Sequence, residues 1–164
     1  MLVSNLDELV LTCLDQNARI GIEEAIKCYN SGAYRAAIVT TYVTICFDLI
    51  EKLKSLAASG DGDAKTAESE LTAAQIQHDQ GNQQGIERLL KFERGLLELF
   101  KDKFEFSGVN EFNDLSRLRE DRNRCAHPSF LKTDVPFTPS AEQARLHIRN
   151  AIVHVCSQEP KQGK

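Results

Sequence analysis

The chain has 164 residues, of which 41% are apolar and 27% charged, and its formal net charge is −4. This length suits one domain with a buried core, and the acidic balance argues against a protein that attracts nucleic acid over its whole surface. Five cysteines without C-x-x-C spacing argue against a disulfide framework or a cysteine zinc site. Buried free thiols suit a reducing compartment, so we expect a cytoplasmic protein. No stretch reaches the roughly 18 apolar residues that a membrane helix needs, and the N-terminus does not resemble a signal peptide.

The first third of the chain predicts two helices followed by a longer one. Residues 4–7 are typical of an N-cap followed by an acid in the first turn, and apolar residues then recur at helical spacing over residues 6–14. A second helical pattern runs over residues 20–29 and ends near Gly32, which is typical of a left-handed cap. Residues 33–58 are apolar on most sides, which predicts a central helix surrounded by its neighbours.

The remaining chain also predicts helices. After a loop at residues 59–63, we expect an exposed helix over 65–78, a turn around Gly81, and helices over 85–103 and 109–126. A loop over 127–137 leads to a last helix, for which Thr138 is the predicted N-cap and Pro139 the first helical residue. No segment alternates with a period of two. The sequence therefore predicts an all-α antiparallel bundle of five to seven helices, as a single domain over 1–157 with a disordered tail over 158–164.

Arg122 is the most informative residue of the helix predicted at 109–126. The buried stripe of this helix consists of Phe112, Leu115, Leu118, Cys125 and Ala126. Arg122 falls near the middle of that stripe, although arginine is almost never buried without a partner. Its guanidinium needs a carboxylate, a set of carbonyls or a cleft that holds an anion. Asp48 and Glu51 are candidate partners for a structural ion pair, and an acid at Asp48 can also support a catalytic arginine.

His127 stands where this helix is predicted to end. It precedes Pro128, and the residue before a proline is pushed out of the helical region. On a continuous helix the side chains of Arg122 and His127 would diverge by about 140°, but the helix end lets the imidazole turn back toward Arg122. This spacing suits two side chains around one phosphate. The alternative is that His127 only satisfies carbonyls or the dipole at the helix end.

The run Arg122-Asn123-Arg124-Cys125-Ala126-His127 resembles the R-x4-6-H motif of HEPN domains. The wider pattern is also similar to that superfamily. A helix opens with YRAAIVTTYVTICFDLIEKL, the motif is followed by H-P-S, and a last helix is entered through TPSAEQA. The similarity spans residues 18–156 and is sharpest in the motif. It implies a HEPN-like helical fold.

This resemblance implies a homodimer that brings two motifs together across a two-fold axis, and a metal-independent endoribonuclease of toxin–antitoxin or anti-phage defence systems. RNA cleavage by attack of the 2′-OH would leave a 2′,3′-cyclic phosphate and a 5′-OH. His127 suits proton transfer because histidine titrates near neutral pH, and Arg122 can hold two phosphate oxygens. Asn123 would orient the imidazole or the phosphate. No metal-ligand set is visible, and we expect no cofactor.

Other polar residues have weaker indications. Arg119 and Arg124 are candidate RNA-binding residues, with a solvated helix face as the alternative. His147 and His154 share a face of the last helix, but a separation of two turns, about 10 Å, is too long for one metal ion. We therefore expect these two histidines to be packed or on the surface.

A non-catalytic member of the same superfamily is the alternative function. Such a module dimerises or docks, and it binds an antitoxin, a nucleotidyltransferase or a larger effector. The segment at 59–85 is longer than a minimal HEPN hairpin needs, and it is a candidate to cover the site or bind a partner. The presence of both Arg122 and His127 favours the enzyme.

Overall fold

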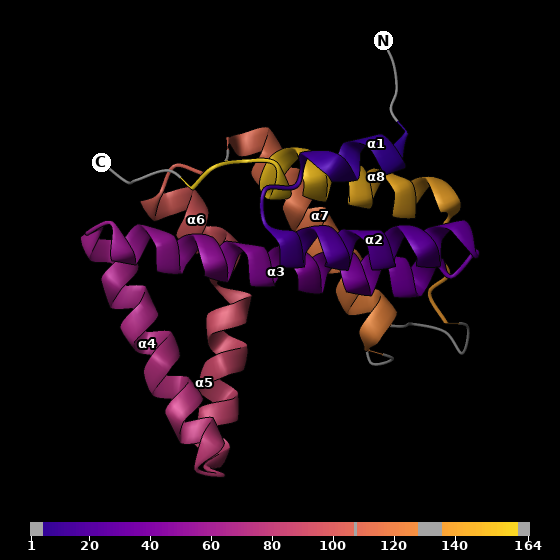
Figure 1. Ribbon diagram of the computed structural model, residues 1–164. Coiled ribbons are helices and arrows are strands. Elements are labelled where there is room, and N and C mark those ends of the chain that lie inside the picture. Colours follow the sequence, from indigo (N-terminus) through magenta and orange to yellow (C-terminus); the bar gives the residue numbers. More distant parts are fainter. Residues whose placement is uncertain (1–4, 107, 128–135, 161–164) are drawn as a thin grey trace. The chain divides into compact units, whose positions relative to one another are not determined.

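The computed structural model describes residues 5–106, 108–127 and 136–160 (Figure 1). Over these ranges helices are the only regular secondary structure, which confirms the all-α prediction. Contacts within the chain divide it into two compact units, Met1–Asp48 with Val109–Gln158 and Leu49–Gly108 with Glu159–Lys164. The single domain over 1–157 stays a prediction. The residues predicted as a tail lie largely outside the described part of the chain, as do most residues of the loop predicted at 127–137.

The first unit contains Arg122, Asn123 and His127, and also Asp48, the predicted supporting acid. Its elements are α1 (Leu6–Leu9), the 3₁₀ turn η1 (Val10–Thr12), α2 (Gln16–Asn30), α3 (Tyr34–Ala58) up to Asp48, α7 (Val109–Ala126), α8 (Ala141–Ala151) and the π-helical turn η3 (Ile152–Cys156). Its core consists of side chains at most 4% exposed, among them Ile22, Ile26, Ile38, Tyr42, Ile45, Leu118, Ile148 and Ile152. Helices α2 and α3 approach closely at Gly21, where a Cβ would overlap the side chain of Thr44.

Local capping explains several helix ends of the first unit. The side chain of Asn5 accepts a hydrogen bond from the amide of Asp7 at 3.0 Å, and that of Asp15 accepts one from Ala18 at 2.9 Å. Helix α2 ends as predicted, since Gly32 has a φ of +83°.

The predicted start of the last helix was wrong by two residues. Ser140 rather than Thr138 is the N-cap, so Pro139 precedes the helix. Ser140 and Gln143 form a capping box in which each side chain accepts from the other's backbone amide, at 3.1 and 2.8 Å. This pairing satisfies two of the amides at the start of α8 that have no partner within the helix.

The second unit is built around a helical hairpin. Helix α4 (Gly62–Asp79) and helix α5 (Gln83–Arg94) lie side by side in Figure 1, joined at Gly81, and α6 (Leu96–Lys103) follows α5 directly. The predicted helix at 65–78 begins earlier because the Asp61 side chain accepts a hydrogen bond from Ala64 at 2.9 Å. The hairpin is closely packed at Gly85, where a Cβ would overlap the backbone of His78.

The helix predicted over 85–103 is divided in two. Gly95 ends α5 and caps α6, and its amide donates to the carbonyls of Lys91 and Phe92, both at 3.2 Å. Glycine is a poor residue for a helix interior. The described residues therefore contain eight α-helices instead of the expected five to seven. Among these helices none has the length and apolar character that a membrane span requires.

Candidate functional site

The candidate site lies at the C-terminal end of α7, whose bounds Val109–Ala126 agree with the prediction. The amide of His127 still donates to the carbonyl of Asn123 at 2.9 Å, so His127 is the first residue beyond the helix. Its side chain is exposed. The predicted end of this helix before His127 is therefore confirmed, while Pro128 and Ser129 lie outside the described residues.

Arg122 is half-buried and held by two neighbours in the first unit. Its guanidinium carbon lies 5.0 Å from the ring centroid of Tyr42 on α3, a ring that is 1% exposed. Its Nη1 donates to Oδ1 of Asn123 at 3.0 Å. Cation–π contact and hydrogen bonding together restrict the guanidinium. The structure thus engages the Asn123 amide oxygen with Arg122, one residue before it.

The predicted supporting acid lies on the helix that carries Tyr42. Asp48 is 2% exposed, although it is an ionisable residue. A buried carboxylate requires partners, and its pairing with Arg122 stays a prediction. Glu51, the other candidate, is exposed and lies 3.5 Å from the ammonium of Lys54.

The two candidate RNA-binding arginines differ in their surroundings. Arg119 is half-buried and lies one turn before Arg122 on α7. Arg124 is exposed, its Nη1 lies 3.6 Å from Asp121, and its guanidinium carbon lies 5.4 Å from the ring centroid of Phe137. Asp121 therefore offsets part of the charge at Arg124.

Two aspartate–histidine pairs, not predicted from the sequence, connect α7 with α8 and η3. Asp121 Oδ2 lies 2.7 Å from His147 Nε2, and Asp114 Oδ2 lies 3.0 Å from His154 Nε2. The two aspartates are seven residues apart on α7, and the two histidines are seven apart, His147 on α8 and His154 in η3. The pairs occur in opposite order along the chain, so α7 and the α8–η3 segment run antiparallel. The sequence contained one signal for these pairs, because the two aspartates and the two histidines have the same spacing of seven residues.

The inner pair is the more buried. The side chains of Asp121 and His147 are 13% and 6% exposed, against 32% and 14% for Asp114 and His154. A hydrogen bond shielded from water is stronger than an exposed one, so the inner pair keeps its geometry better than the outer pair. Because Asp121 directly precedes Arg122, this contact fixes the last turns of α7 against α8.

Cys125 is a thiol rather than a thiolate at neutral pH. Burial and then the nearby carboxylate of Asp121 raise its pKa from 9.0 to about 11, against the lowering effects of Arg35 and Arg124. The thiolate is the nucleophilic form, so Cys125 is not an activated nucleophile.

A hollow of about 540 Å³ lies beside Cys125 in the first unit. Its lining consists of Gly32, Ala33, Tyr34, Arg35, Ala36, Val39, Cys125, Thr138 and Pro139. It lies between the start of α3 and the approach to α8. It adjoins the last turn of α7 without including Arg122 or His127.

Comparison of the chain with protein-family models, with curated proteins and with solved structures finds no match. Among residues 5–106, 108–127 and 136–160, no three His, Cys, Asp or Glu side chains gather closely enough to hold a metal ion.

Proposed function

We propose that this protein is a metal-independent endoribonuclease of the HEPN type, acting in toxin–antitoxin or anti-phage defence. The observation that supports it most is the arrangement at the end of α7. Arg122 is restrained by Tyr42 and Asn123, and an exposed histidine follows directly beyond the helix.

The chemistry requires a proton acceptor, a proton donor and a stable positive charge. The 2′-OH of the ribose loses its proton as its oxygen attacks the adjacent phosphorus, and the 5′-oxygen takes a proton as its bond to phosphorus breaks. His127 is the proposed proton-transfer group. Arg122 is the proposed partner of the non-bridging oxygens, where negative charge accumulates. The products are a 2′,3′-cyclic phosphate and a 5′-OH.

Restraint of Arg122 before substrate arrives favours this role. A preorganised cation stabilises developing charge without reorganisation during the reaction. Asn123 then acts as a positioning residue, because it touches the guanidinium. Arg119 and Arg124 are the proposed contacts to flanking phosphates, where each adds local positive charge to an acidic chain.

The proposal includes a homodimer. Val43 and Phe47 lie one turn apart on α3 in the first unit and are 40% and 66% exposed. Large apolar side chains exposed next to each other are typical of an interface. The same pair favours the second candidate function, a non-catalytic module that docks on an antitoxin or nucleotidyltransferase.

The chemical groups at the ends of the cleaved RNA test the proposal. The purified protein is incubated with a radiolabelled RNA in excess EDTA, and with the same RNA carrying 2′-O-methyl groups throughout. We expect cleavage of the unmodified RNA only, with 2′,3′-cyclic phosphate ends. Cleavage of the 2′-O-methyl RNA, or cleavage abolished by EDTA, would contradict the mechanism. Absence of cleavage with every RNA tested would favour the docking module.

A further inference from the structure

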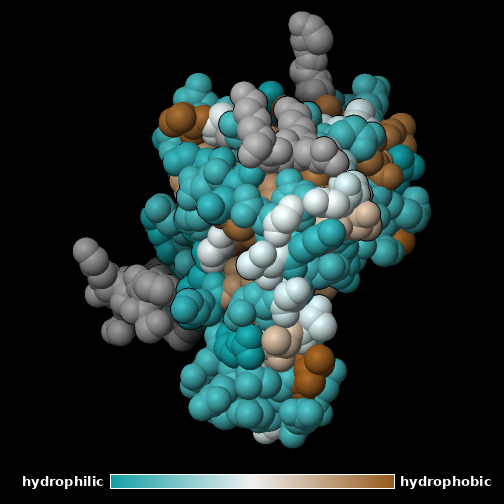
Figure 2. Space-filling view, turned by 90° about the vertical axis from the view of Figure 1, so that its left-hand side faces the viewer, coloured by the Kyte–Doolittle hydropathy of each residue, from teal (hydrophilic) through white to brown (hydrophobic). Residues whose placement is uncertain are grey.

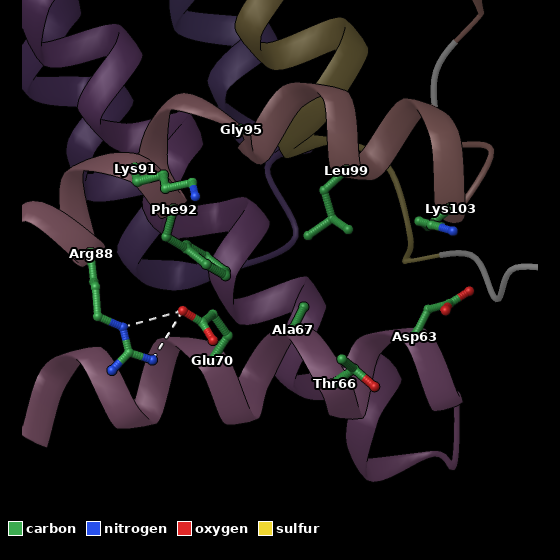
Figure 3. Close-up of a pocket in the computed structure, with 10 residues that line it drawn as sticks. All are labelled: Asp63, Thr66, Ala67, Glu70, Arg88, Lys91, Phe92, Gly95, Leu99 and Lys103. Atoms are coloured by element: carbon green, nitrogen blue, oxygen red, sulfur yellow. Dashed lines mark hydrogen bonds and ion pairs between the residues drawn. The ribbon is translucent and has the colours of Figure 1, made fainter.

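The second unit contains a groove that the proposed function does not use. It has a volume of about 740 Å³ and lies along α4, α5 and α6 (Figure 3). Its lining consists of Asp63, Thr66, Ala67, Glu70, Arg88, Lys91, Phe92, Gly95, Leu99 and Lys103. This volume is in the range of sites that hold small organic molecules, about 300–1,000 Å³.

The floor of the groove is apolar. In Figure 3 the side chains of Phe92 and Leu99 extend from α5 and α6 toward α4, where Ala67 lies. All three residues are only half-buried. Covering such surface with an apolar group is favourable because it removes apolar area from water. The break at Gly95 sets this floor, since it divides the helix between Phe92 and Leu99.

The charges around the groove are unequal. Arg88 is satisfied within the hairpin, since its Nη2 lies 3.0 Å from Glu70 and its Nη1 donates to Gln77 at 2.8 Å. Lys91 and Lys103 form no ion pair with any residue in the described ranges. Figure 3 draws Lys103 at the same end as Asp63, and Lys91 at the other end. Of the two lining carboxylates, Glu70 pairs with Arg88 and Asp63 lies at the opposite end from Lys91. The charge of Lys91 is therefore not balanced by a carboxylate of the lining.

We propose that this groove binds an amphipathic organic anion, with an aromatic or acyl body on the floor of Phe92 and Leu99 and its anionic group at Lys91. The net charge of the chain is −4, so a site for anions requires a local excess of positive charge such as this one. The inference goes beyond the nuclease proposal, because no lining residue belongs to the motif.

A small ligand fits the surface better than a protein partner. The exposed large apolar residues of the hairpin are Ile76, Ile86 and Leu90, and none of them lines the groove. Figure 2 shows a mainly hydrophilic hairpin surface, at the bottom of the view, with one small hydrophobic patch. A stable protein interface needs about 800 Å² from each partner, and these exposed residues lie outside the groove, so they do not indicate a protein partner for it.

Binding of 1-anilinonaphthalene-8-sulfonate, an amphipathic anion that fluoresces in apolar surroundings, tests the proposal with the full chain. We expect one saturable site per chain, with displacement by decanoate. The uncharged analogue N-phenyl-1-naphthylamine reports the floor alone. Lys91→Gln should weaken sulfonate binding about threefold to fivefold and leave the uncharged probe unaffected. Lys65→Gln, an exposed lysine of α4 outside the groove, is the matched control.

A second variant and a second measurement locate the site. Ala67→Phe should fill the groove and abolish binding of both probes, with folding checked by circular dichroism. If that variant does not fold, amide chemical shifts of the wild type decide. Shifts on sulfonate binding should concentrate at Ala67, Gly95 and Leu99. Shifts confined to the first unit, non-saturable binding, or equal sulfonate affinity in Lys91→Gln and wild type would overturn the proposal.

Discussion

At the residue scale, the Asp121–His147 contact holds the last turns of α7 against α8. It joins α7 to α8 one residue before Arg122, at 2.7 Å and largely shielded from water. The imidazole Nδ1 of His147 is buried and has no hydrogen-bond partner among the described residues. The pair therefore acts through one ring nitrogen, and loss of that contact is not compensated by the other.

Removal of this contact should destabilise the fold. His147→Phe leaves a shielded carboxylate at Asp121 whose remaining ion-pair partner among the described residues is Arg124, at 3.6 Å. An unsatisfied buried polar group costs about 1–3 kcal/mol. We expect that loss in urea unfolding. His154→Phe at the more exposed pair is the matched control and should cost less. Equal losses in the two variants would show that burial of the inner pair is unimportant.

The raised pKa of Cys125 predicts that the folded chain loses stability at alkaline pH. Its pKa is raised in the folded chain to about 11, from 9.0. The unfolded chain therefore loses this proton first, so the associated stability is present below pH 9 and is lost as the pH rises toward 11. Wild type should lose more stability than Cys125→Ala between pH 8.5 and 10.5, as measured by urea unfolding at each pH. Parallel pH profiles would contradict the shift.

Arg122 and His127 could be singled out from the sequence, but their contacts could not. Proline after His127 is a local signal, so the exposed histidine beyond α7 was predictable. The contacts of Arg122 with Tyr42 and Asn123 depend on the packing of α7 against α3 and on a rotamer. The Asp–His pairs depend on the register of two antiparallel helices. Spacing alone does not determine that register.

At the scale of elements, the correctly predicted helix ends follow from single local residues. The wrongly predicted ones are places where local signals compete or are masked by apolar spacing. The left-handed Gly32 and the end of α7 follow from single residues. The start of α8 was misassigned because Thr138-Pro139 and Ser140 offer competing caps, and the reciprocal contact with Gln143 decides between them. The division at Gly95 was missed because apolar residues continue at helical spacing on both sides of it.

Gly85 should be essential to the α4–α5 hairpin. A Cβ at this position would overlap backbone atoms of Gln77 and His78, which cannot move as a side chain can. Forcing such helices apart costs about 1–3 kcal/mol, so Gly85→Ala should lower the free energy of unfolding by that amount. Gly62→Ala is the control, since a Cβ there meets nothing within 4 Å. Unfolding of both variants by urea provides the comparison, and a stable Gly85→Ala would disprove the close packing.

At the scale of the whole molecule, composition and periodicity were sufficient for the all-α class. The two compact units were not predicted, because contacts between distant segments leave no regular pattern in a sequence. Helix α3 contributes residues to both, up to Asp48 in one and from Leu49 in the other. The proposed function belongs to the first unit and the proposed ligand groove to the second.

The proposed dimer gives a prediction at this scale. If exposed Val43 and Phe47 form its interface, Phe47→Ser should turn a dimer into a monomer in sedimentation velocity experiments. Ile76→Ser, at an apolar residue 53% exposed on the hairpin, should remain dimeric. A wild-type monomer at all concentrations tested, or a dimeric Phe47→Ser variant, would contradict this assignment of the interface.

The single-turnover rate of RNA cleavage in EDTA, compared between wild type and motif variants, tests the central claim most directly. His127→Ala should reduce the rate about 10²–10⁴-fold, as expected for loss of general acid–base catalysis. Arg122→Ala should reduce it about 10²–10³-fold, through lost stabilisation of the phosphorane charge. His78→Ala, which alters an exposed residue of the second unit, should cleave like wild type. Folded His127→Ala or Arg122→Ala proteins that cleave RNA at the wild-type rate would contradict the account.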